Sequence, residues 1–375
     1  MILSEVQVAV RDMVRDMAQE RIRPHSARFA ADGGYPPQLF QDLAQLGLMG
    51  MTAPEQAGGA GADYVSYALA LIELAAADGA LSTIVSIQNS IMVSGILKDG
   101  TAAQQARWLP ELTSGRMIGA FALTETDAGS DAAAIRTTAT RVDGGWRLNG
   151  GKQFITSGKI AGVAMVIAVT DPAAGRKGMS AFLVPTDTPG YVVDKVEHKL
   201  GQSASDTCAL RFEDCVVPDD ALLGAEGRGY SIALANLEAG RIGIAAQAVG
   251  MAQAALDIAI AYAHDRTSFG KPIIEHQAVG FRLADLATKL EASRQLVLHA
   301  ASLKDAGEPA LTAASMAKLF ASEAAEAIVS GAIQTLGGYG YLEEFGLARI
   351  YRDVRVCQIY EGTSDIQRMV IARGL

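Results

Sequence analysis

The spacing of apolar residues along the chain changes twice. Up to about residue 117, apolar side chains recur at intervals of three and four, as at Leu39, Leu43 and Leu46, which predicts amphipathic helices. The same spacing returns after Gly229, for instance in the apolar stripe between residues 279 and 290, and continues almost to the end of the chain. Several such helices in series predict a bundle.

Between these helical parts the apolar spacing shortens to two, which predicts β-strands. Residues 135–142 are rich in β-branched side chains, the turn Asp143-Gly144-Gly145 follows, and Trp146 begins a return strand, so we expect a β-hairpin. The pattern predicts an α+β multidomain protein with an N-terminal helical domain (1–118), a middle antiparallel β domain (119–228) and a C-terminal helical bundle (229–375). Further strands are expected at residues 163–170, 180–184, 191–196 and 208–212.

The composition is that of a folded globular protein. Half of the 375 residues (50%) are hydrophobic and 19% are charged, which is too apolar for a disordered chain and enough for a large core. The net charge is −9 and the basic residues are scattered, so we expect no nucleic-acid partner. The three cysteines are an odd number without C-x-x-C spacing, which is typical of a reducing compartment.

The first residues show no signal or transit pattern, because charged residues interrupt every apolar stretch there. The most apolar tract, residues 67–97, is broken by Glu73 and Asp78 and does not predict a membrane span. We therefore expect a cytoplasmic protein without membrane insertion.

Several kinds of active site lack their motifs. The five histidines show no close ligand spacing, so no metal site is predicted. The chain contains no G-x-S-x-G elbow of a serine hydrolase and no G-x-G-x-x-G between a strand and a helix, as a Rossmann dinucleotide site requires.

Two polar segments in the middle of the chain are not explained by packing. Residues 123–131 are small and Gly-rich and can present backbone N–H groups to a ligand, although a solvated, capped loop is the simpler explanation. Residues 151–158 contain Phe154, whose ring could cover a planar ligand or fill the core beside a strand.

A third polar segment lies near the C-terminus. Ser364 and Gln367 match a capping box that would open a final helix, and Glu361 and Gly362 lie in the loop before it. Gly362 leaves its backbone open to a ligand. The Glu361 carboxylate could interact with the helix dipole, or it could be a general base.

Six segments in this order resemble the acyl-CoA dehydrogenase family over the whole chain. One such motif would be weak, but six in register are specific. The resemblance implies a homotetramer whose subunits have an N-terminal helical domain, a middle β domain and a C-terminal four-helix bundle. The segments are Leu123-Thr-Glu with Ala128-Gly-Ser-Asp131, Phe154-Ile-Thr156, Arg266-Thr-Ser-Phe-Gly270, Glu275-His-Gln277, Gln334-Thr-Leu-Gly-Gly338 and Ile359-Tyr-Glu-Gly-Thr363.

The resemblance further implies that FAD lies between the β domain and the bundle, with the bundle of a neighbouring subunit completing the site. Arginine suits the cofactor's diphosphate because a guanidinium can bridge two phosphate oxygens. The positions that match flavin contacts are Phe121, Leu123, Thr124, Ser130, Phe154, Ile155 and Thr156. Those that match diphosphate and adenosine contacts across the subunit boundary are Arg266, Phe269, Gln277, Gln334, Thr335, Leu336, Gly337 and Gly338. Thr363, Ser364 and Asp365 match residues beside the cofactor.

The implied reaction is the α,β-dehydrogenation of a short or short branched acyl-CoA to the trans-2-enoyl-CoA. Glu361 would remove the α-proton while the β-hydrogen leaves as hydride to flavin N5, and the electrons would pass to electron-transferring flavoprotein. The thioester oxygen would accept hydrogen bonds from the backbone N–H of Glu361 and from a ribityl hydroxyl of FAD. The positions that match substrate contacts are Ser130, Glu238, Ala239, Gly240, Arg241 and Gly362.

Three positions depart from the residues usual in the family. Phe154 stands where Trp is common, and Asp365 stands where Glu or Gln is frequent. Gly240 stands where some relatives carry the base, which leaves Glu361 without a rival. Two alternatives are considered: an enzyme of the same fold that reacts with oxygen, and a non-catalytic protein that has kept the fold. For the first, the chain length and Glu361 argue against a flavin monooxygenase and leave an acyl-CoA oxidase.

Overall fold

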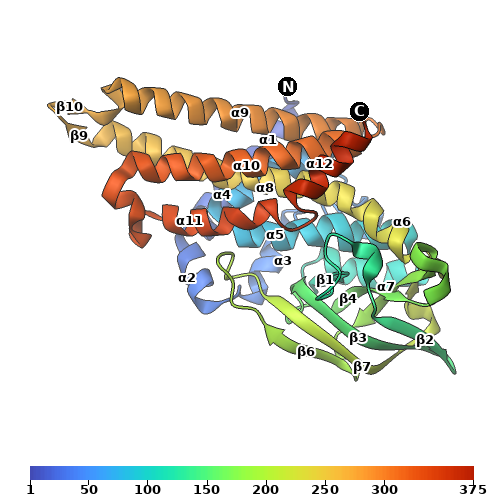
Figure 1. Ribbon diagram of the computed structural model, residues 1–375. Coiled ribbons are helices and arrows are strands. Elements are labelled where there is room, and N and C mark those ends of the chain that lie inside the picture. Colours follow the sequence, from blue (N-terminus) through green and yellow to red (C-terminus); the bar gives the residue numbers. More distant parts are fainter.

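The computed structural model describes residues 1–375 and begins with a series of helices (Figure 1). Local caps start several of them: Ser4 and Thr101 each form a capping box with the Gln three residues later, and Asp78 caps the helix that follows it. The α-helices of this part are α1 (Glu5–Met17), α2 (Ser26–Asp32), α3 (Pro37–Gln45), α4 (Tyr64–Ala77), α5 (Gly79–Ile87), α6 (Ser94–Asp99) and α7 (Ala102–Thr113).

The longest helix, α8 (Gly229–Asp265), packs against α4 and α5 on one side and against the C-terminal helices on the other. Glycine allows this close approach, because a Cβ at Gly250 would lie 2.1 Å from the carbonyl oxygen of Ile72. One hydrophobic core therefore extends from the N-terminal helices through the bundle. The remaining helices are α9 (Gln277–Asp305), α10 (Leu311–Leu336), α11 (Leu347–Val354) and α12 (Ser364–Arg373).

The middle of the chain forms an eight-stranded sheet of order β6-β7-β3-β2-β4-β5-β8, with β1 beside β4. The expected hairpin is confirmed, since β2 pairs with β3 and Arg141 lies opposite Trp146. The strands are β1 (Gly119–Ala122), β2 (Thr138–Val142), β3 (Gly145–Thr156), β4 (Val163–Val169), β5 (Met179–Pro185), β6 (Tyr191–Val196), β7 (Thr207–Pro218) and β8 (Leu222–Leu223).

The expectation of a purely antiparallel sheet is wrong at β4. Both β1 and β2 run parallel to this strand. β1 enters the sheet directly from the helical domain and is not joined to β4 by a tight turn, so nothing requires the two strands to be antiparallel.

Strand β4 is buried on both faces, which explains its short apolar run. Val163, Met165 and Ile167 belong to the core shared with the helices, whereas the alternate residues Ala164 and Val166 belong to a separate core. This packing sets the sheet beneath the helices, as Figure 1 shows.

Two helical stretches, Gly79–Asp99 and Gly229–Asp265, are long and apolar enough to cross a membrane when judged by length and composition alone. Both are mostly buried inside the protein. Core helices of this kind pass the same test, so the two stretches are weak support for a membrane span.

Candidate active site

Glu361 lies in a sharp bend between the short 3-10 helix Arg355–Gln358 and α12. Glu361 and Gly362 both have positive φ angles, 51° and 91°. A non-glycine residue in the left-handed region is uncommon and needs support from its surroundings. The support comes from Lys318 Nζ and Gln367 Nε2, which donate to the carbonyl oxygen of Gly362 at 2.6 and 2.8 Å.

The Glu361 carboxylate points at α8. A Cβ at Gly240 would lie 2.0 Å from Glu361 Oε2, so only glycine leaves room for this side chain. Oε2 is buried and accepts no hydrogen bond. Burial raises the pKa of Glu361 to about 7, and the positive charges of Lys318 and Arg241 offset part of that rise.

Unsatisfied polar atoms are concentrated around this bend. Buried side-chain polar atoms normally have a partner, and an orphan requires an explanation. The backbone N–H of Glu361 also makes no hydrogen bond within the chain. The bend therefore offers both donors and acceptors to a polar ligand. The orphaned side-chain atoms here are Arg241 Nε, Glu361 Oε2, Ser364 Oγ and Gln367 Oε1.

Lys152 links the two segments predicted to flank a planar ligand. Its side chain is fully buried, and Nζ donates to the Leu123 carbonyl oxygen at 3.0 Å and to Glu125 Oε1 at 2.7 Å. Two residues further along β3, Phe154 has a φ of 60° and is 64% exposed. An exposed aromatic ring beside a rigid polar loop suits a flat, heteroatom-rich group.

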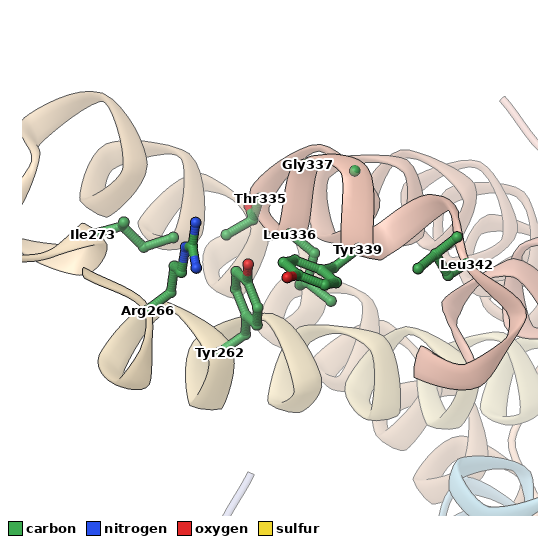
Figure 2. Close-up of a pocket in the computed structure, with 9 residues that line it drawn as sticks. Tyr262, Arg266, Ile273, Thr335, Leu336, Gly337, Tyr339 and Leu342 are labelled. Carbon is green, nitrogen blue, oxygen red and sulfur yellow. The ribbon is translucent and has the colours of Figure 1, made fainter. Parts of the chain in front are cut away.

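The opposite end of the bundle contains a cavity of about 460 Å³ (Figure 2). Arg266, Tyr262 and Tyr339 extend into it from the end of α8 and from the segment after α10. Thr335, Leu336, Gly337 and Gly338 line it as well. Nearby, the β9–β10 hairpin (Thr267–Ser268 and Lys271–Pro272) carries Phe269, which is 98% exposed.

The two regions lie far apart within one chain. Gly240 and Arg266 are separated by 26 residues of essentially continuous helix, which corresponds to about 39 Å at 1.5 Å per residue. Figure 1 shows the β9–β10 hairpin at one end of the bundle and the β domain toward the other.

Three family models together match almost the whole chain. They are the N-terminal, middle and C-terminal domains of acyl-CoA dehydrogenases, at residues 4–116, 120–215 and 227–375.

The chain belongs to the acyl-CoA dehydrogenase family.

Named relatives agree with this assignment. The chain is 46% identical over 373 residues to the mitochondrial short-chain specific acyl-CoA dehydrogenase of Homo sapiens, covering all of this chain and 90% of the relative. Butyryl-CoA dehydrogenase from Megasphaera elsdenii has a TM-score of 0.97 at 40% identity, with 100% and 99% of the two chains covered. A chain solved in a study of the electron transferring flavoprotein of Acidaminococcus fermentans has a TM-score of 0.98 at 41% identity, with 100% and 98% covered.

The protein is thus an FAD-dependent oxidoreductase that dehydrogenates acyl-CoA substrates. Several expected contact residues of this acyl-CoA dehydrogenase are in the core: the side chains of Leu123, Ile155 and Leu336 are buried among hydrophobic residues. Any contact that Leu123 and Ile155 make with a cofactor must come from the backbone, whereas Leu336 also lines the Arg266 cavity. Ser130, Phe154, Arg266, Phe269, Gln277, Gln334, Gly337, Gly338 and Asp365 are exposed, and Phe121, Thr124, Thr156, Thr363 and Ser364 are partly buried.

Most of the residues expected to contact substrate lie on α8, next to Glu361. Ala239 and Gly240 are buried in α8, and Arg241 Nη1 donates to Ser315 Oγ at 3.3 Å. Glu238 forms an ion pair with Lys304 at 3.1 Å, which gives that carboxylate a structural partner.

The expected helix cap is shifted by one residue. Thr363, not Ser364, is the N-cap of α12 and accepts from the Ile366 N–H. Gln367 does not complete a capping box, because the N3 position is then Ile366; the Gln367 side chain donates to the Glu361 and Gly362 carbonyls instead.

Sequence reasoning missed several residues that hold the site. Lys318 and Lys152 are cations at buried positions, and this mismatch with apolar surroundings is the signal that could have revealed them. Gln247 accepts from the Tyr360 hydroxyl and donates to Thr83 Oγ1 at 2.5 Å, anchoring the residue before the base. No sequence pattern predicts that contact.

Proposed function

We propose that Glu361 is the catalytic base that removes the α-proton of a short or short branched acyl-CoA. The observation that carries this proposal is the buried, unpartnered Oε2 in a strained bend of the chain. A carboxylate whose pKa lies near 7 is ionised in about half of the molecules at neutral pH and is a far stronger base than an exposed one.

The free backbone N–H of Glu361 is the chain's own candidate donor to the thioester oxygen. A hydrogen bond to this oxygen stabilises the negative charge that develops as the α-proton leaves. The positive φ of Gly362 turns the chain beside this N–H, and a Cβ there would lie 2.8 Å from Gln367 Nε2, so the missing side chain lets the bend pack against α12. Base and donor then come from one residue.

The residues present fit FAD. Phe154, Thr124 and Thr156 would flank the flavin, and Arg266 would hold the diphosphate at the Tyr262–Tyr339 cavity. When bound, FAD supplies the hydride acceptor of the reaction.

The separation of about 39 Å between the base and the Arg266 cavity supports a site shared between subunits. One cofactor would reach both regions only if the cavity came from a neighbouring chain. The fully exposed Phe269 beside that cavity is consistent with contact to another subunit. We propose a homotetramer, as the family resemblance implies.

Relatives support the substrate and the redox partner. The human relative is named as short-chain specific and the Megasphaera elsdenii structure as a butyryl-CoA dehydrogenase. The Acidaminococcus fermentans structure comes from a study of electron transferring flavoprotein. We propose butyryl-CoA or isobutyryl-CoA as substrate and electron-transferring flavoprotein as acceptor, in the cytoplasm.

The test is anaerobic reduction of the bound flavin by butyryl-CoA. E361Q should keep the flavin spectrum and lose at least about a hundredfold in reduction rate. The exposed-residue control E308Q should reduce at the wild-type rate. Full reduction in E361Q would remove Glu361 from the role. Peroxide release in air without an added acceptor would instead favour the oxidase.

A further inference from the structure

Lys318 carries an ammonium group at a buried, apolar position. It lies on α10 among the buried alanines Ala314, Ala317 and Ala321, and only 1% of its surface is exposed. Burying a cation is costly unless its partners compensate for the lost water. A methionine would fill such a position without that cost.

The one hydrogen bond of Lys318 is to the residue that follows the base. Nζ donates to the Gly362 carbonyl oxygen at 2.6 Å and forms no ion pair within 4.0 Å. Glu361 is near enough for the two charges to act on each other's pKa. Lys318 therefore faces the peptide between Gly362 and Thr363 and, at longer range, the Glu361 carboxylate.

The bend needs such a partner. Glu361 and Gly362 are consecutive residues with positive φ, and the left-handed region is unfavourable for a side chain such as that of Glu361. The Gly362 carbonyl accepts two hydrogen bonds, one from Lys318 and one from Gln367. A charged donor makes the stronger of the two bonds.

We propose that Lys318 is a positioning residue for catalysis: its hydrogen bond to the Gly362 carbonyl locks the Glu361–Gly362 bend and places an ammonium group beside the base. This inference rests on the proposed role of Glu361. It assigns to α10 a function in proton abstraction, although Lys318 touches neither the substrate nor the reacting atoms.

Other groups also face the carboxylate. Arg241 on α8 adds a second positive charge. Burial raises the pKa of the Tyr67 hydroxyl on α4, and the charge of Glu361 raises it further. Glu238 on α8 acts on Arg241, and the buried Cys357 thiol lies beside Lys318. Arg241 stays charged at every accessible pH, whereas burial lowers the pKa of Lys318 to about 8. Of the two cations, only Lys318 can lose its charge near the working pH.

The variants are K318M, which removes the donor and the charge, and K318R, which keeps both. Anaerobic flavin reduction by butyryl-CoA is measured from about pH 6 to about pH 9. K318M should lose about tenfold or more in rate, and the midpoint of its pH profile should move up by about half a unit or more. The direction follows because loss of a neighbouring positive charge raises the pKa of Glu361. K318R should keep the wild-type midpoint, and K289M, on the exposed face of α9, should change nothing.

A second measurement does not depend on turnover. Infrared difference spectra against pH show the protonated carboxyl band that E361Q lacks, and its midpoint in K318M should move upward as the kinetic midpoint does. If K318M does not fold, K318Q keeps a donor without the charge and should show the same upward movement. Unchanged midpoints in both methods would overturn the inference. If E361Q itself reduces the flavin normally, the proposed base is wrong; if E361Q is inactive and K318M behaves as wild type, only the role of Lys318 is wrong.

Discussion

At the scale of single residues, the site depends on a contact between Gly240 and Glu361, two positions 121 residues apart. Gly240 has no side chain, and the Glu361 carboxylate fills the space that a side chain there would take. The sequence predicts Glu361 as a base candidate and Gly240 as a position without a rival carboxylate. It does not predict that the two residues touch, because no local pattern links α8 to a loop near the C-terminus.

The first prediction concerns this contact. In G240A the new Cβ would meet Oε2 at 2.0 Å and displace the base. Flavin reduction by butyryl-CoA should slow by about a hundredfold or more, since small misplacements of a catalytic group carry such penalties. The measurement is stopped-flow reduction, with G280A as a helix control whose Cβ has its nearest neighbour at 3.1 Å. Equal rates in G240A and wild type would contradict the contact.

A second prediction follows from the raised pKa of Glu361, which changes from the ordinary 4.5 to about 7 on folding. The folded state holds this proton more tightly than the unfolded state, so the contribution of Glu361 to stability is complete below about pH 4.5 and is lost as the pH rises through about 7. The two pKa values differ by about 2.5, which corresponds to about 3 kcal/mol.

The amide in E361Q does not titrate, so this variant does not lose stability as the pH rises. It should melt at a higher temperature than wild type at about pH 8 and at nearly the same temperature near pH 5. Differential scanning calorimetry at both pH values measures the difference. A lower melting temperature for E361Q at the higher pH would mean that the ionised carboxylate is stabilised by the fold.

At the scale of elements, the flavin-flanking segments depend on β3 and the loop after β1 being held together. Glu125 joins them: it accepts from Lys152 and also from the backbone N–H groups of Arg136 and Thr137. The sequence predicts the strands and the turns here, because alternation and glycines are local signals. The ion pair joins residues from two segments, so it could not be predicted without the fold.

The third prediction tests this link. K152M leaves Glu125 without its cation, and the loose loop should bind FAD at least about tenfold more weakly. Affinity is measured by fluorescence titration of the apoprotein with FAD. K159M, at an exposed lysine of the same domain, should bind like wild type. Wild-type affinity in K152M would show that the ion pair serves stability alone.

At the scale of the whole molecule, the order of the three parts could be predicted from the change in apolar spacing, and the structure has the same order. The parallel pairing of β4 with β1 and β2 could not be predicted, because strand order depends on long-range packing. The shared core of α4, α5 and α8 could not be predicted from the local sequence pattern either, because it depends on small residues that allow particular helices to pack closely.

The fourth prediction concerns a site built from two chains. R266E should lose cofactor binding at the cavity, and E361Q should lose proton abstraction. When the two chains are coexpressed, mixed oligomers contain some sites with an intact base from one chain and an intact arginine from the other. These oligomers should regain reduction by butyryl-CoA that neither variant shows alone. Absence of recovery in verified mixed oligomers would argue that each chain completes its own site.

The length of α8 has one more consequence. α8 has 37 residues, with the base region near one end and the arginine cavity beyond the other. If the site is shared between subunits, an isolated chain therefore contains two parts of different active sites and no complete one. Dilution should then inactivate the enzyme through subunit loss, with cofactor release following dissociation. Recovery on reconcentration should depend on the square or a higher power of protein concentration.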